Sequence, residues 1–254
     1  MIAGGVLFSI LAAGFFFQAS WATDLWLWPY ASRLSNIFIA SILLAIAAPI
    51  LWIGITGEIG AAQGGALNLL VSFGGIAVLL AQRASAIDDS RTAQFAGIFA
   101  VGTLIAAGAY LYSRTFEIRT PIPTPRTLRW SFAVLSVALI FFASLLLRGS
   151  AHVFPWPLPH ATSVVYGWVF LGAAVYFAHG FFWPSWQNAA GQLLGFLAYD
   201  LVLLGAFLGH RNDVLADHRL SLNIYSAVVV ASALLAIYYL AVHPATRLWA
   251  RAPS

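Results

Sequence analysis

Residues 34–57 read LSNIFIASILLAIAAPILWIGITG and contain no Asp, Glu, Lys or Arg. Arg33 and Glu58 flank this stretch on its two sides. A helix needs about 20 largely apolar residues to cross the hydrocarbon core of a bilayer. The stretch between the two charges meets that length, so it predicts a membrane-spanning helix.

The whole chain shares the character of this stretch. Of its 254 residues, 61% are hydrophobic and 8% are charged, and the mean hydropathy is +0.88. A soluble domain carries about 25% charged residues, so this chain has too few charges for its surface to be well solvated by water. These values exclude a soluble globular protein, a disordered chain and a nucleic-acid binder, and they predict a polytopic membrane protein. The absence of cysteine excludes disulfides, thiolate metal sites and Cys nucleophiles.

Charge-free intervals divide the rest of the chain into further spans. The interval 149–199 is too long for one helix and breaks near Pro184, which disfavours a continuing helix. An alternative for residues 1–22 is a signal peptide, although no basic residue precedes Asp24. We predict an all-α integral membrane protein with eight transmembrane helices, at about 2–20, 34–56, 59–82, 92–113, 128–148, 161–183, 187–208 and 219–242.

The first four predicted spans superpose on the last four when the sequence is aligned with itself so that Leu67 matches Leu194. The Trp-Pro pairs at 28–29 and 156–157 then lie one place apart, and GxxxG pairs at 60–64 and 191–195 open the third and seventh spans. This pattern predicts two parallel four-helix repeats, related by an axis along the membrane normal. The expected divisions are a first repeat at 1–113, a Pro- and Arg-rich linker at 114–127, a second repeat at 128–243 and a C-terminal tail at 244–254.

The basic residues, all of them Arg, give an orientation signal only through their clustering. With eight spans, both termini and the linker share one side, which holds six Arg, and the opposite side also holds six. Because basic residues favour the cytoplasmic side, we expect both termini there, in a bacterial cytoplasmic membrane. The cluster that decides this consists of Arg114, Arg119, Arg126 and Arg129.

Asp200 is the charged residue that does not fit the pattern, because it lies near the middle of the seventh predicted span. A carboxylate at the bilayer centre costs about 2.5–3.5 kcal/mol, and such a residue usually faces the helix bundle or a watery cavity. One interpretation is a site for a proton, a cation or a substrate. The other is structural, a protonated Asp bonded to a neighbouring Tyr, Ser or backbone carbonyl. The equivalent position in the first repeat is Phe73, so symmetry supplies no second carboxylate.

The predicted substrate or proton site contains four further polar residues besides Asp200, namely Tyr199, Gln192, Asn223 and His179. A cavity that reaches Asp200 and is lined by Tyr199, Gln192 or Asn223 would favour transport, whereas a dry and fully packed Asp200 would count against it. His179 differs from Asp200 by roughly 13 Å in depth, which argues against a direct dyad. The main interpretation of His179 is an interfacial histidine with a backbone partner, and the alternative is a contact with Gln187, Asn188 or His243 on the same membrane side.

The sequence indicates no metal site, no cofactor and no catalytic residue. His and Asp residues gather in the predicted loop at 210–218, but no spacing typical of a metalloenzyme is present. No nucleotide-binding Gly loop or nucleophile elbow occurs, and the sequence resembles no characterised family closely enough to name one.

Two hypotheses for the function remain. The first is a transporter- or permease-like protein with an interior polar site at Asp200. The second is a non-catalytic accessory or scaffold subunit of a membrane complex, and a membrane-embedded enzyme is a distant third. The expected partners are the lipid bilayer and either other membrane subunits or further copies of the chain, and not nucleic acid.

Overall fold

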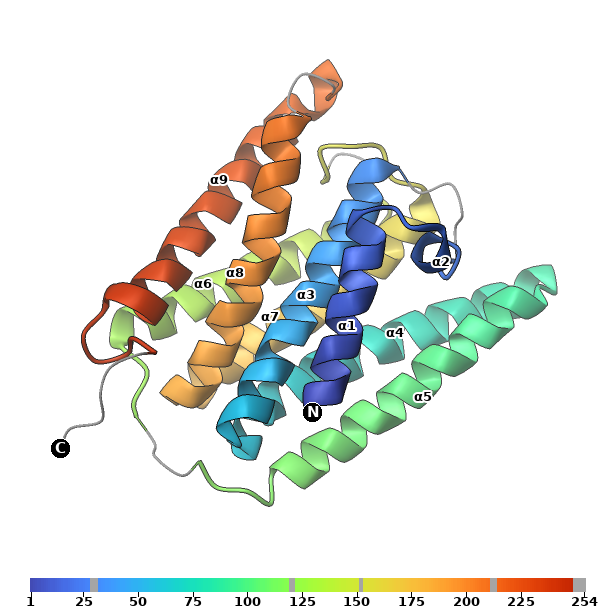
Figure 1. The fold of residues 1–254 in the computed structure, drawn as a ribbon. Coiled ribbons are helices and arrows are strands. Elements are labelled where there is room, and N and C mark those ends of the chain that lie inside the picture. The colour runs from blue at the N-terminus through green and yellow to red at the C-terminus, as the bar shows by residue number, and fades with distance from the viewer. Residues whose placement is uncertain (28–31, 119–121, 151–152, 211–213, 249–254) are drawn as a thin grey trace. The chain divides into compact units, whose positions relative to one another are not determined.

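The computed structural model describes residues 1–27, 32–118, 122–150, 153–210 and 214–248. Regular secondary structure in this part of the chain is helical (Figure 1). The helices are α1 (Ile2–Phe16), α2 (Ser20–Thr23), α3 (Arg33–Thr56), α4 (Gln63–Ile87), α5 (Ser90–Ser113), α6 (Arg126–Leu147), α7 (His160–Phe182), α8 (Trp186–Gly209) and α9 (Arg219–Ile237). Single turns named η1 (Ile59–Ala62), η2 (Ala216–His218) and η3 (Tyr238–Val242) adjoin α4 and α9.

Seven helices of the described chain are long and apolar enough to cross a membrane: α3 to α9, with η1, η2 and η3 as extensions. Their bounds lie within a few residues of the last seven predicted spans. The largest difference is in α4, which runs to Ile87 and ends where Asp88 adopts a positive φ of 49°. The chain is therefore a multi-pass helical membrane protein whose outer helix faces contact the bilayer.

The first predicted span, 2–20, differs from the structure. α1 has 15 residues and rises about 22 Å, which is less than the roughly 30 Å of the hydrocarbon core. Gln18 has a positive φ of 55°, and the Ala19 amide donates to the Gly14 carbonyl at 2.9 Å. This is the Schellman arrangement that ends a helix. The chain then turns back, and Ala22 of α2 packs against Gly14, so the apolar run does not continue as one helix.

The chain divides into two compact units. Unit 1 consists of Met1–Gly57, Phe154–Trp156 and Ala189–Ser254, and unit 2 consists of Glu58–Val153 and Pro157–Asn188. Each unit therefore takes helices from both halves of the sequence, so the units do not coincide with the repeats expected at 1–113 and 128–243. The division into repeats remains a prediction. Trp28, Pro29 and Arg119 lie outside the described residues.

In unit 1, α3 packs closely against two neighbours at glycine positions. A Cβ atom on Gly5 of α1 would lie 2.6 Å from Cγ of Leu51. A Cβ atom on Gly195 of α8 would lie 2.8 Å from the carbonyl oxygen of Ala45. Van der Waals contact at small residues is the main attraction between helices in lipid, so these positions fix the arrangement of α1, α3 and α8.

In unit 2, α4 and α7 approach each other in the same manner. A Cβ atom on Gly64 would lie 2.8 Å from the Tyr176 ring, and one on Gly172 would lie 2.5 Å from the carbonyl oxygen of Asn68. The Ser136 hydroxyl of α6 donates to the Ala174 carbonyl of α7 at 2.9 Å. α6 and α4 are thus both held to α7.

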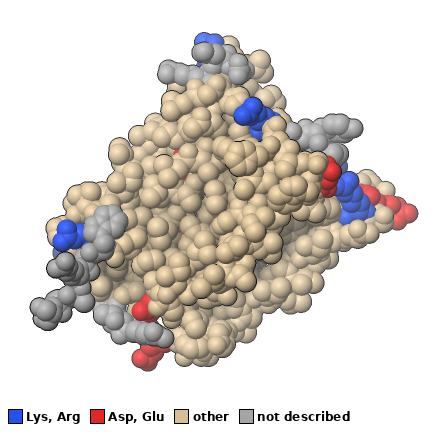
Figure 2. All heavy atoms as spheres, viewed as in Figure 1, with Lys and Arg blue, Asp and Glu red and all other residues tan. Residues whose placement is uncertain are grey.

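Figure 2 shows few charged side chains among the described residues of the visible face, and most of its atoms belong to uncharged residues. α5 is the least buried of the long helices. Lipid is the natural environment for its exposed side chains, because they are mostly apolar and include several large ones. Examples are Ile98, Leu104, Ile105 and Leu111.

Two substitutions in α8 test the close approach of α8 to α3. Gly195→Leu places a side chain against the Ala45 carbonyl, whereas nothing lies within 4 Å of a Cβ atom on Gly205. We expect Gly195→Leu to lower the free energy of unfolding by about 1–3 kcal/mol through overpacking. The matched control Gly205→Leu should change it by at most about 0.5 kcal/mol. Unfolding in mild detergent measures both, and equal effects would contradict the packing described for α8.

Candidate functional site

Asp200 lies inside α8, near the middle of the helix as the sequence predicts. It is about 21 Å from the Trp186 end and about 14 Å from the Gly209 end. Its side chain is 1% exposed. The Ser232 hydroxyl of α9 donates a hydrogen bond to Oδ2 of Asp200, with 2.6 Å between the oxygens. Within the described residues, this hydroxyl is the polar partner of the carboxyl, and no cationic side chain pairs with it.

Ser232 has one hydroxyl proton and three acceptors within reach. Besides Asp200 Oδ2, these are the carbonyl oxygens of Val228 at 2.9 Å and of Val229 at 3.2 Å. One proton cannot serve a carboxylate and a carbonyl equally well. A protonated Asp200 removes this competition, because its O–H donates to Ser232 Oγ while Ser232 donates to Val228. The geometry therefore accommodates both an ionised and a protonated carboxyl.

Tyr199 directs its side chain to α9. Its hydroxyl is hydrogen-bonded to the hydroxyl of Tyr225. Tyr225 precedes Ser232 by seven residues, or about 10 Å, so Tyr225 lies nearer than Ser232 to the end of α9 that begins at Arg219. The structure thus pairs the predicted residue Asp200 with Ser232 and the predicted residue Tyr199 with Tyr225. The sequence alone did not indicate Ser232 or Tyr225.

Aromatic rings surround the tyrosine pair within unit 1. The centroid of the Phe154 ring is 5.8 Å from that of Tyr225, and the centroid of Phe38 is 6.0 Å from that of Tyr199. Phe207 packs on Tyr225 at 5.3 Å. Edge-to-face contacts of this kind fill space closely, so the phenols lie in an apolar setting.

Gln192 and Asn223 do not join this cluster. Gln192 is 1% exposed, but it precedes Asp200 by eight residues and lies about 12 Å from it along α8. Asn223 is exposed on α9. The site expected from the sequence stays a prediction, and the contacts described here support its Asp200 and Tyr199 members.

His179 belongs to unit 2 and has its own partners. The Asn188 side-chain amide donates to Nδ1 of His179 at 3.2 Å, which is one of the contacts in the alternative interpretation of the sequence. The Trp183 ring stacks on the imidazole with 5.0 Å between centroids. His179 therefore packs at the turn between α7 and α8, where it supports local structure.

A metal centre has no basis in the described residues, since no group of three or more His, Cys, Asp or Glu side chains is placed to hold an ion. His152 and residues 211–213 lie outside the described residues. His218, in the same predicted loop, donates from Nδ1 to the carbonyl oxygen of Phe154 at 2.9 Å. That bond gives His218 a structural contact.

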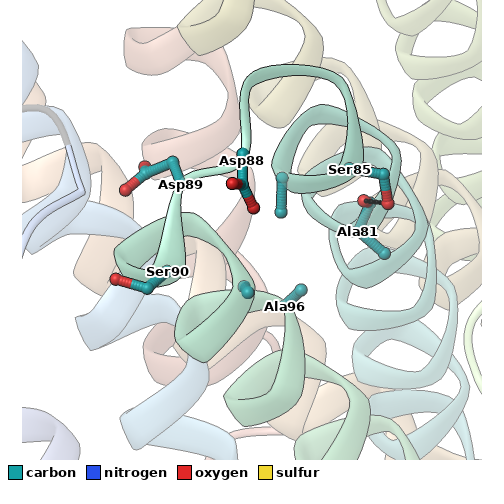
Figure 3. A pocket seen from close by; sticks show the side chains of 8 residues that line it. Ala81, Ser85, Asp88, Asp89, Ser90 and Ala96 are labelled. Atoms are coloured by element: carbon teal, nitrogen blue, oxygen red, sulfur yellow. Dashed lines mark hydrogen bonds between the residues drawn. The ribbon is translucent and has the colours of Figure 1, made fainter.

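A pocket of about 410 Å³ lies at the turn between α4 and α5 (Figure 3). Small side chains line it together with Asp88 and Asp89, and Figure 3 shows Asp88 pointing into the space while Asp89 points away. Asp89 caps α5, because its carboxylate accepts hydrogen bonds from the amides of Arg91 and Thr92 at 3.2 Å. The Thr92 hydroxyl also donates to it at 2.5 Å. This last bond is the main cause that lowers the pKa of Asp89 below its ordinary value.

Replacing Asp89 by Asn tests this cap, because Asn keeps the capping geometry but does not titrate. A lowered pKa in the folded state means that the carboxylate stabilises α5 above its unfolded pKa of about 3.9. That stabilisation is lost as the pH falls through the lower folded value. We expect the amide protection of Arg91 and Thr92, relative to Asp89→Asn, to decline over this range. Hydrogen exchange in detergent measures it, and a constant ratio would contradict the cap.

No family model, no curated protein and no solved structure matches the chain. The architecture itself identifies a multi-pass helical membrane protein.

Proposed function

We propose that the protein is a transporter- or permease-like membrane protein in which Asp200 is the proton-binding group of an interior polar site. The observation that carries the proposal is a carboxyl in the middle of a membrane span, almost fully buried, whose partner is the single hydroxyl of Ser232. Intramembrane ionisable groups commonly belong to proton or substrate pathways.

The energetic balance favours a protonated Asp200 while the carboxyl is packed as it is in this structure. A charged carboxylate at the centre of a span costs about 2.5–3.5 kcal/mol. Hydrogen bonds between helices in a membrane contribute about 0.6 kcal/mol on average and at most about 1.7 kcal/mol. The bond from Ser232 therefore does not offset the cost of an ionised Asp200.

A proton can be gained or lost at Asp200 with little movement of its neighbours. In the protonated state, Oδ2 donates to Ser232 Oγ, and Ser232 donates to the Val228 carbonyl. In the ionised state, Ser232 turns its proton to Oδ2, and the Val228 carbonyl keeps its bond within α9. Rotation of one hydroxyl connects the two states.

The two compact units support an internal duplication into two parallel four-helix repeats. The shift that superposes the predicted spans carries Ala45 onto Gly172 and Asn68 onto Gly195. In unit 1 the tight approach brings Gly195 against the carbonyl oxygen of Ala45, and in unit 2 it brings Gly172 against that of Asn68. The same two repeat positions therefore make the close contact in both units.

The composition of the units agrees with the same duplication. Unit 1 combines the hairpin α1 and α3 of the first proposed repeat with the hairpin α8 and α9 of the second. Unit 2 combines α6 and α7 of the second repeat with α4 and α5 of the first. Parallel repeats related by an axis along the membrane normal occur in transporters, which favours a permease-like protein.

The second candidate is an accessory or scaffold subunit, and the burial of Asp200 away from solvent favours it. A carboxyl with 1% exposure, surrounded by packed side chains, also suits a permanently protonated group that joins α8 to α9. In that case Asp200 contributes stability and the chain moves no proton.

Purified protein in liposomes separates the two candidates. We expect wild-type vesicles under an imposed potential to pass protons, detected by an entrapped pH dye, and Asp200→Asn to reduce that flux at least about tenfold. Asn retains hydrogen-bonding capacity, so the free energy of unfolding should change by no more than about 1–2 kcal/mol. The control Asp217→Asn alters an exposed carboxyl on the same α8–α9 connection and should leave the flux unchanged.

Wild-type vesicles that pass no more protons than protein-free vesicles would contradict the proposal. So would equal flux in the wild type and in Asp200→Asn. A large loss of stability in Asp200→Asn, without any flux in the wild type, would instead support the scaffold subunit.

A further inference from the structure

Phe154, Pro155 and Trp156 form a buried segment within unit 1, although they belong to the loop that joins α6 to α7. Phe154 is 1% exposed and Trp156 is 4% exposed. Residues of a connecting loop are usually at the surface, because their backbone polar groups need water. The burial of this segment therefore calls for a specific reason.

Two hydrogen bonds and several ring contacts hold the segment in place. Nε1 of Trp156 donates to Oγ of Ser35 in α3 at 3.0 Å. Nδ1 of His218 donates to the carbonyl oxygen of Phe154 at 2.9 Å. The Phe154 ring packs edge-on against Phe38, with 4.8 Å between centroids. Because these bonds join the segment to side chains, it can leave without unwinding a membrane span.

The segment lies at the end of unit 1 that is closer to Asp200. Trp156 contacts Phe207, two residues before the Gly209 end of α8, at 6.5 Å between centroids. Asp200 is about 14 Å from that end of α8 and about 21 Å from the other.

The segment also packs against the tyrosine pair that adjoins Asp200 in sequence. Phe154 packs on Tyr225, whose hydroxyl bonds to Tyr199, and Asp200 is the next residue along α8. Along α9 from its Arg219 end, the order is thus Tyr225, on which Phe154 packs, and then Ser232, the hydrogen-bond partner of Asp200.

We infer that Phe154–Trp156 is a plug that closes access to Asp200 from the end of unit 1 formed by the α6–α7 loop. Water and protons reach the phenols and then the carboxyl when the plug withdraws, and the seated plug keeps the site dry. This inference rests on the proposed proton-binding role of Asp200 and explains why a group with that role is 1% exposed.

The absence of cysteine makes the plug directly testable, because a single introduced thiol has no background. The reporter is Ser232→Cys in the full chain in vesicles, exposed to a small membrane-impermeant thiol reagent from each side in turn. With Trp156 intact, we expect slow modification from both sides. Trp156→Ala should accelerate it at least about tenfold, and only from the side of the α6–α7 loop.

Two further variants separate plug removal from general loosening. Trp156→Phe keeps a ring but loses the bond to Ser35, so it should give a smaller acceleration. Trp168→Ala removes a tryptophan that packs against Gly75 in unit 2 and should give none. If Trp156→Ala fails to fold, Ser35→Ala removes the same hydrogen bond and should reproduce the effect of Trp156→Phe.

Unchanged modification in Trp156→Ala would overturn the plug, as would an equal increase in Trp168→Ala or an increase from the opposite side alone. Failure of the plug can be distinguished from failure of the proposed function, because thiol labelling measures water access to the site and not proton binding. Accelerated labelling together with a proton flux that is insensitive to Asp200→Asn would retain the plug and reject Asp200 as the proton site.

Discussion

The hydrocarbon core of a bilayer offers neither hydrogen-bond partners nor counter-charges, and this constraint explains most of the molecule. Backbone amides and carbonyls must be satisfied inside each span, so the spans are helices. Charged side chains move to the helix ends, which is why Arg33 and Glu58 flank α3 so closely. Asp200 is the exception to this rule, and the hydroxyl of Ser232 is what the protein supplies in place of water.

The same constraint changes how helices hold together. Because lipid tails are as apolar as Leu, burying an apolar side chain between helices adds little, and close van der Waals contact matters more. Gly195 lets α8 reach the backbone of α3, and Gly172 lets α7 reach the backbone of α4. The shift that superposes the proposed repeats also places these two contacts at equivalent positions. This agreement is the main support for the proposed internal duplication. Among the described residues, the buried carboxyl is Asp200 of unit 1, and Phe73 occupies the position that the proposed duplication makes equivalent to it.

The long spans and the position of Asp200 were predictable, because a charge in or beside an apolar run is visible in the sequence itself. The end of α1 was not, because hydropathy does not register the left-handed turn at Gln18. Ser232 and Tyr225 were missed for another reason. Which residues of α9 face Asp200 depends on the register of two antiparallel helices, and a lone Ser in an apolar span gives no signal of its own. The burial of Trp156 likewise depends on a partner far away in sequence, Ser35.

The account depends on one property, that Asp200 takes up and releases a proton while it stays buried between α8 and α9. Because only six of the 254 residues are Asp, protein labelled with ¹³C at the Asp carboxyls gives few signals, and Asp200→Asn identifies the one from Asp200. We predict that this signal moves reversibly with pH between its protonated and ionised positions while the helices remain folded. A signal that stays in one position at every pH at which the protein is folded would contradict the account.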